Sequence, residues 1–179
     1  MIYTLLAEGF EEIEALTVVD ILRRADLGVK TVSVTEDTEV CGAHGIKVIA
    51  DEILDNTDND FDLIYIPGGY PGYVNLESSP VVTELLKNAY NSKKIVAAIC
   101  AAPSILGKLE LLKGKTACCF PSFEEYLLGA NVSFDDVCTD GNIITSRGAG
   151  TAHTLGFKIV EHFKGKDYAD KLKSAMLYK

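Results

Sequence analysis

The sequence predicts an α/β fold built on a mainly parallel sheet with helices on both faces. The main observation is that short apolar runs alternate along the chain with segments of helical periodicity. The second observation is that sharp turns follow three of the predicted elements, at 8–10, 67–69 and 100–102. No repeat, low-complexity tract or linker interrupts this order, so residues 1–179 are expected to form a single domain.

The first fifty residues supply two strands, a helix and a short excursion. The apolar run at 2–6 predicts a buried strand, and the run at 30–34, rich in β-branched residues, predicts a second. Residues 11–25 between them are a predicted helix, because apolar residues recur at helical spacing. Residues 38–50 hold two strand-like runs around Gly42 and Gly45, which predict a hairpin or an excursion from the main sheet.

The rest of the chain continues the alternation of strands and helices. The strand at 63–66 stops at a Pro-Gly-Gly turn, and the helix at 80–90 begins with a proline, whose missing N–H costs little there. The remaining predicted strands lie at 95–99, 116–119 and 143–146, and the remaining predicted helices at about 102–109, 150–163 and 166–177. In such sheets ligands sit beyond the carboxyl ends of the strands, so the turns are where chemistry is expected.

Charge and cysteine content limit the partners and the compartment. The chain has 17 basic and 26 acidic residues, a net charge of −9, and its basic residues are scattered, so neither nucleic acid nor an anionic membrane is an expected partner. Five cysteines without a CxxC pair indicate free thiols in a reducing compartment. Without a basic leader or a run of about 20 apolar residues, the chain is expected to be cytoplasmic.

Cys100 is the first candidate for chemistry. It follows the apolar run at 95–99 and precedes a helix with Pro103 near its start, so it lies on a strand-to-helix turn flanked by small residues. Free N–H groups and the helix dipole at such a turn favour the thiolate, which predicts a reactive thiol rather than a buried apolar side chain. The other four cysteines are interpreted as structural or only incidentally oxidised.

Glu14 is the second candidate. It shares a helical face with apolar residues at 18, 21, 22 and 25, so its carboxyl is expected to point inward. Burial raises the pKa of a carboxyl, and a protonated carboxyl can donate a hydrogen bond to a thiolate and exchange a proton with it. The alternative is that Glu14, like Glu11 and Glu12, only complements the helix dipole.

The backbone supplies the third part of the candidate site. Gly68 and Gly69 offer unobstructed N–H groups that, with the N–H of Ala101, could form an oxyanion hole; the alternative is a plain tight turn. The three histidines, at 44, 153 and 162, are interpreted as structural or solvated. No His, Cys or carboxylate group has the spacing of a metal site, so no metal is expected.

Five sequence blocks together resemble the ThiJ/PfpI superfamily, in the branch of the Parkinson-disease-associated deglycase (DJ-one). They lie at 8–15, 20–25, 66–69, 97–103 and 145–151 and cover essentially the whole chain. The resemblance implies a flavodoxin-like three-layer sandwich, usually a homodimer, with Cys100 as nucleophile, Glu14 as its partner, and Gly69 and Ala101 in the backbone pocket. Two positions depart from the family pattern, because Ala101 and Phe120 stand where branches of the family carry a histidine.

The resemblance implies a cofactor-independent enzyme that acts on reactive dicarbonyls, either as a glyoxalase converting methylglyoxal to lactate or as a deglycase repairing glycated proteins. Small aldehydes or glycated proteins would then be its partners. One alternative is a redox-sensing or chaperone-like stress protein that uses the same cysteine. A third is a cysteine amidase or peptidase, which the absence of a histidine directly after Cys100 disfavours.

Overall fold

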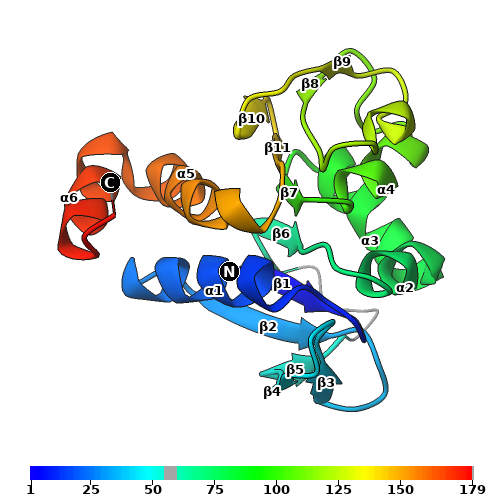
Figure 1. Cartoon of the computed structure of the whole chain (residues 1–179), viewed down its shortest axis with the longest axis horizontal. Helices are drawn as coiled ribbons and strands as arrows, with labels where there is room; N and C mark the ends of the chain where they lie inside the picture. The colour runs from blue at the N-terminus through cyan, green and yellow to red at the C-terminus, as the bar shows by residue number, and fades with distance from the viewer. Residues whose placement is uncertain (55–59, 179) are drawn as a thin grey trace.

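A seven-stranded sheet forms the centre of the molecule. The computed structural model describes residues 1–54 and 60–178. The sheet has the order β10-β11-β7-β6-β1-β2-β5, and every neighbouring pair except β10–β11 is parallel. Its strands are β1 (Ile2–Leu6), β2 (Val29–Ser33), β5 (Glu52–Ile53), β6 (Leu63–Ile66), β7 (Ile95–Ile99), β10 (Val137–Asp140) and β11 (Ile143–Ser146). The predicted mainly parallel α/β fold is confirmed (Figure 1).

Helices cover both faces of this sheet and make a three-layer sandwich (Figure 1). One face carries α1 (Glu12–Arg24), α5 (Ala152–Lys164) and α6 (Lys166–Ala175). The other carries α2 (Gly72–Ser78), α3 (Pro80–Asn91) and α4 (Pro103–Lys108). Because successive side chains of a strand point to opposite faces, β7 serves both cores: Val96 and Ala98 face one, and Ile95, Ala97 and Ile99 face the other.

The short pairs outside the main sheet differ in how well they were predicted. β3 (Glu39–Cys41) and β4 (Lys47–Ile49) pair antiparallel, as the prediction of a hairpin or excursion at 38–50 required. The predicted strand at 116–119 is partly wrong, because β8 covers only Thr116–Ala117 and pairs with β9 (Asn131–Val132). Cys118 instead donates its N–H to the hydroxyl of Thr145 at 2.9 Å, so a side chain replaces the strand partner.

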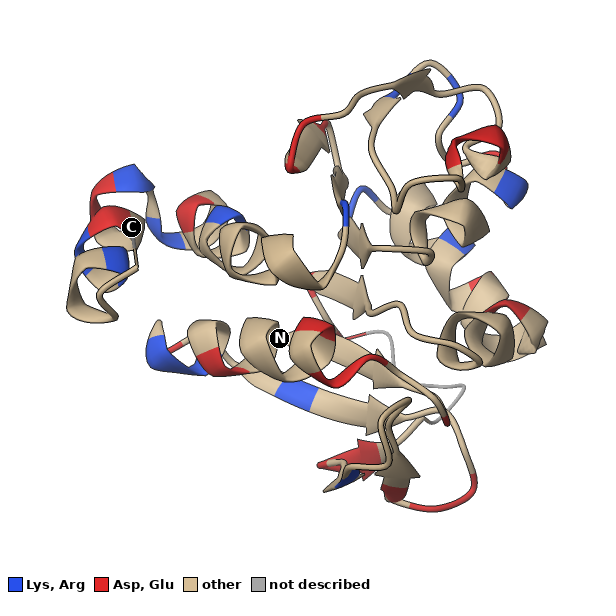
Figure 2. Cartoon of the chain, viewed as in Figure 1, with Lys and Arg blue, Asp and Glu red and all other residues tan. Residues whose placement is uncertain are grey.

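Elements without a clear apolar period were not predicted. These are β5, β9, β10, α2 and two 3-10 turns, η1 (Glu124–Tyr126) and η2 (Ala149–Thr151). All are short, and tertiary contacts rather than local sequence stabilise them. Lys and Arg residues are spread over several elements, with acidic residues between them (Figure 2). Among the described residues, no helix has both the length and the apolar character needed to cross a membrane.

The strand order places one crevice at the carboxyl edge of the sheet. From β1 the chain first adds β2 and β5 on one side, and then returns to add β6, β7 and β11 on the other. The order therefore reverses between β1 and β6, and crevices at such switch points hold ligands in open α/β sheets. The segments that follow β1, β6 and β7 contain Glu14, Gly68 and Cys100.

Candidate functional site

Cys100 occupies the turn between β7 and α4, as predicted. Its φ of 64° lies in the left-handed region, which L-residues other than glycine adopt at a cost. Main-chain hydrogen bonds hold this conformation: its N–H donates to Ser146 at 3.0 Å, and its carbonyl accepts the N–H of Phe120 at 2.8 Å. The residue remains partly exposed. Two main-chain hydrogen bonds thus hold a strained residue that is only partly buried.

Glu14 reaches the thiol from α1, and its predicted burial is confirmed, since the residue is only 1% exposed. Glu11 caps the helix by accepting the N–H of Glu14 at 2.8 Å. Tyr65 donates its buried hydroxyl to the Glu14 carbonyl at 2.9 Å. The Glu14 carboxyl accepts the N–H of Gly68 at 2.8 Å and hydrogen-bonds the side chain of Cys100. The carboxyl and the sulfur therefore meet inside the crevice.

Gly68 separates these two groups from the neighbouring backbone. A Cβ atom at this position would lie 2.7 Å from Oε2 of Glu14, closer than real Cβ atoms approach, and 3.2 Å from Sγ of Cys100, which is a tight contact. Its N–H is bound to Glu14, so the expectation that Gly68 contributes to an oxyanion hole is wrong. The N–H groups of Gly69 and Ala101 are the ones that hydrogen-bond the Cys100 sulfur.

The electrostatics of the pair correct one prediction. Burial raises the pKa of Glu14 to about 7, against hydrogen bonds from Cys100 and Gly68 that lower it. The pKa of the Cys100 thiol is also raised, first by burial and then by the negative charge of Glu14. These two effects outweigh the hydrogen bonds from the N–H groups of Ala101 and Gly69, which lower the pKa. The predicted lowering of the thiol pKa by the helix end is therefore wrong, because burial disfavours the thiolate and the anionic carboxylate in contact opposes a second anion.

Glu14 and Cys100 consequently titrate as one unit. Two adjacent buried anions are unfavourable, so the pair retains a proton over the neutral range and carries at most one negative charge. With the proton on sulfur, Glu14 is a base in contact with a thiol. With the proton on Glu14, the carboxyl can donate to a thiolate that also accepts from Gly69 and Ala101. The site can thus move a proton between sulfur and oxygen without solvent.

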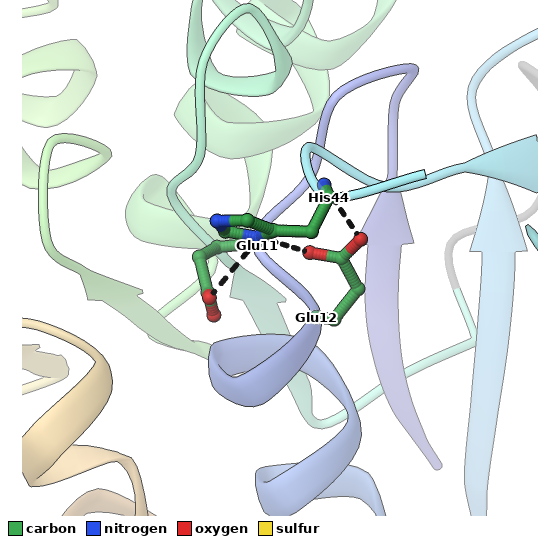
Figure 3. Close-up of side chains that lie close together, drawn as sticks. All are labelled: Glu11, Glu12 and His44. Atoms are coloured by element: carbon green, nitrogen blue, oxygen red, sulfur yellow. Dashed lines mark hydrogen bonds and ion pairs between the residues drawn. The ribbon is translucent and has the colours of Figure 1, made fainter. Parts of the chain in front are cut away.

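A second cluster lies beside this site, at the start of α1 (Figure 3). Glu12 accepts main-chain N–H groups from His44 at 2.8 Å and Ile46 at 3.3 Å, and its other oxygen lies 2.8 Å from Nδ1 of His44. Glu11 lies 3.8 Å from the same nitrogen. Glu11, Glu12 and His44 offer ligand atoms within 4.8 Å of one another, which the sequence did not indicate because His44 lies 32 residues from Glu12. The hydrogen bonds of Glu12 explain why these three side chains lie together, because they attach the β3–β4 hairpin to the start of α1.

Two histidines and the other cysteines are not among the hydrogen-bond partners of the Cys100 and Glu14 side chains in the described part of the chain. His153 stacks on Tyr178 and His162 lies edge-on to Phe163, consistent with the structural interpretation. Three of the four remaining cysteines are buried, and Cys41 is partly exposed. Phe120, where a histidine was considered, contributes its N–H to the Cys100 carbonyl, and the residue as a whole is 46% exposed.

The chain is similar to known proteins over most of its length. The model of the DJ-1/PfpI family matches residues 1–162. "Protein DJ-1 homolog B" of Arabidopsis thaliana is 40% identical over 167 residues, which cover 92% of this chain and 38% of that protein. This chain spans less than half the length of that relative and of its Arabidopsis paralogue, homolog A.

Two further relatives match over nearly their whole length. The "Glutathione-independent glyoxalase DJR-1.2" of Caenorhabditis elegans is 34% identical over 92% of this chain and 89% of that protein. The structure of oxidized DJ-1 from Toxoplasma gondii superposes with a TM-score of 0.94 at 34% identity, covering 99% of this chain and 97% of that chain. On the family match and these identities, the chain belongs to the DJ-1/PfpI family.

Proposed function

We propose that the chain is a cofactor-independent enzyme that uses Cys100 to act on reactive dicarbonyls, converting methylglyoxal to lactate or releasing such groups from glycated proteins. The observation that carries this proposal is the contact between the Cys100 thiol and the buried Glu14 carboxyl, beside the N–H groups of Gly69 and Ala101. The name of the Caenorhabditis elegans relative supports the substrate class.

In the proposed reaction, the sulfur of Cys100 attacks the aldehyde carbon of methylglyoxal while Glu14 takes the thiol proton. The oxygen of the former aldehyde gains negative charge and accepts N–H groups from Gly69 and Ala101 before it is protonated. Glu14 then moves a proton from the aldehyde carbon to the ketone carbon, and the hemithioacetal hydroxyl proton passes to the ketone oxygen, which converts the hemithioacetal into a thioester. Water hydrolyses the thioester, releasing lactate and restoring the thiol. No external oxidant or reductant is required, because the aldehyde carbon is oxidised as the ketone carbon is reduced.

The proposal is tested by measuring lactate production from methylglyoxal with wild type, Cys100→Ser and Glu14→Gln. Loss of the nucleophile should reduce the rate to background. Loss of the proton carrier should reduce kcat by roughly 10²–10⁴-fold. Cys138→Ser, a substitution at a cysteine that lies outside the site, is the control and should retain the wild-type rate. Equal rates for wild type and Cys100→Ser would refute the proposal.

The coupling of the two groups has its own signature. The rate at which iodoacetamide alkylates Cys100 should rise with an apparent pKa of about 7, the value for Glu14, because loss of the first proton from the pair creates the reactive anion. In Glu14→Gln this step should disappear, leaving reactivity only at alkaline pH. Mass spectrometry of the Cys100 peptide measures both profiles. Identical profiles would show that the carboxyl does not control the thiol.

Redox sensing is the second candidate. An oxidised Cys100 sulfur would present oxygens to a carboxyl whose pKa of about 7 lets it donate a hydrogen bond. The Toxoplasma gondii relative was studied in an oxidized form. Mild peroxide followed by mass spectrometry should oxidise Cys100 well before the buried Cys118. Equal oxidation of the two cysteines would contradict this role.

We also propose that the chain forms a homodimer. Ile13 on α1 and Ile46 and Ile49 of the hairpin segment are each more than half exposed. The N–H of Ile46 is bound to Glu12, which places the hairpin against the start of α1. Light scattering should report twice the chain mass, and Ile49→Lys should shift the protein toward the monomer. A wild-type protein that is monomeric at micromolar concentration would contradict the proposal.

A further inference from the structure

A shallow, open cavity of about 340 Å³ lies on the β11 side of the turn that carries Cys100. Its walls are Phe120, Pro121 and the segment 147–151 that follows β11. Main-chain hydrogen bonds join both walls to Cys100. The N–H of Phe120 donates to the Cys100 carbonyl, and the N–H of Cys100 donates to the carbonyl of Ser146, which directly precedes the segment 147–151. The cavity is therefore fixed in position relative to the nucleophile.

The lining of this cavity is largely apolar. Apart from Arg147 and Thr151, it consists of a phenyl ring, a proline and small residues. The ring of Phe120 lies against Gly148, where an added Cβ would be 3.3 Å from the ring edge. Behind it, Phe123 packs edge-on to Phe120 at 6.5 Å and to Tyr73 at 5.6 Å, so the ring is supported from one side while 46% of the residue stays open.

The apolar lining suits Phe120 for binding an apolar group rather than for proton transfer. A phenyl ring carries no proton, so Phe120 cannot assist acid–base chemistry at the thiol. A supported, partly exposed ring on a residue that is hydrogen-bonded to the main chain of Cys100 offers instead a flat surface on which an apolar or aromatic group is removed from water. The aldehyde of methylglyoxal carries only an acetyl group, which leaves most of such a cavity unfilled.

We infer that this cavity is the substituent subsite of the enzyme, and that Phe120 makes α-oxoaldehydes with an aryl-sized apolar substituent better substrates than methylglyoxal. The inference rests on the proposed dicarbonyl activity and specifies its substrate class. In this arrangement the aldehyde lies at the Cys100 sulfur, and its substituent extends past the main chain of the turn onto the ring of Phe120.

The test compares kcat/KM for phenylglyoxal and methylglyoxal. The ratio should exceed about tenfold in the wild type, since one added methylene alone is worth roughly that much in an apolar pocket. Phe120→Ala should lower the ratio roughly tenfold, and Phe120→Leu, which keeps an apolar side chain, should give an intermediate value. Phe134→Ala is the matched control: Phe134 is 69% exposed and does not line the cavity, so the ratio should stay unchanged. Initial rates and intact mass exclude modification of Arg147 by the aryl glyoxal.

A second measurement separates this inference from the proposed activity. N-benzyliodoacetamide and iodoacetamide alkylate thiols without any glyoxalase step, and their relative rates at Cys100 report the subsite alone. The benzyl reagent should be favoured in wild type and lose that advantage in Phe120→Ala. Turnover of methylglyoxal with no aryl preference in either assay would overturn the inference and leave the proposed function standing. Aryl preference in alkylation without turnover of either aldehyde would overturn the proposed function and leave only an aryl-binding subsite beside Cys100.

Discussion

Two glutamates in the first turn of α1 differ in what burial does to them. Glu12 and Glu14 are 5% and 1% exposed, yet the pKa of Glu14 is raised to about 7 and that of Glu12 is lowered. Burial acts in the same direction on both. Glu12 also accepts hydrogen bonds from the His44 side chain and from main-chain N–H groups that include those of His44 and Ile46, and these outweigh burial. Glu14 has one main-chain donor, Gly68, and a thiol.

The difference teaches that donor number and depth of burial together decide which carboxylate is structural and which is available for proton transfer. Glu12 is ionised in a full set of hydrogen bonds and anchors the hairpin. Glu14 is held where its charge is poorly compensated, which is the condition for exchanging a proton with Cys100 near neutral pH. The comparison predicts that the same substitution will have opposite effects at the two positions.

Glu14→Gln should give the largest effect on stability. Because folding raises this pKa from 4.5 to about 7, the folded state binds more protons than the unfolded state in that window, and stability falls as pH rises through it. The substitution should therefore stabilise the protein by up to about 3 kcal/mol at pH 8, and the gain should vanish near pH 4.5. Urea unfolding at a series of pH values measures it. A loss of stability at pH 8 would mean that Glu14 is as well satisfied as Glu12.

Gly68→Ala should reduce turnover of methylglyoxal by about 100-fold. The added Cβ would displace the Glu14 carboxyl and the Cys100 sulfur, and a misplacement of about 1 Å can cost this much in rate. Gly28→Ala is the matched control, since its Cβ would lie no closer than 3.4 Å to the flexible side chain of Met1. Steady-state kinetics checks both variants. A fully active Gly68→Ala enzyme would show that the contact across Gly68 is dispensable.

Glu12→Gln should destabilise the protein by about 1–2 kcal/mol at pH 7, because it weakens charge-assisted hydrogen bonds to a buried acceptor. Since the pKa of Glu12 is lowered in the folded state, this contribution is present above its unfolded pKa and is lost as pH falls through the folded value. The urea midpoint relative to wild type should therefore recover in acid. If Glu12→Gln instead stabilised the protein at pH 7, the Glu12 carboxylate would be poorly compensated, as that of Glu14 is.

His44→Gln should have the smallest effect, because the imidazole side chain is 69% exposed. Its hydrogen bond to Glu12, followed by the attraction of the same carboxylate, raises the pKa of His44. The stabilisation is therefore complete below the unfolded pKa of about 6.5 and is lost as pH rises through the raised folded value. Thermal unfolding of wild type and variant should differ at pH 5.5 and converge in the alkaline range. A difference that grows with pH would contradict the assignment.

The sequence by itself determined the main features of the fold. The bounds of β1, β6, β7 and β11 follow from apolar runs long enough to fill a buried strand, and α1 follows from its period. The same local reasoning placed Cys100 on its turn and Glu14 on the inner face of its helix, because both properties depend on neighbours in the chain.

Only the tertiary structure decided the charge on these groups and the partners of the glycines. The pKa of Cys100 depends on a carboxyl 86 positions earlier in the sequence, and the N–H of Gly68 is assigned to Glu14 by the adjacency of β1 and β6. The same holds for His44, which meets Glu12 across a hairpin. Strands and turns arise from interactions over a few residues, whereas electrostatic coupling arises between segments that the chain topology brings together.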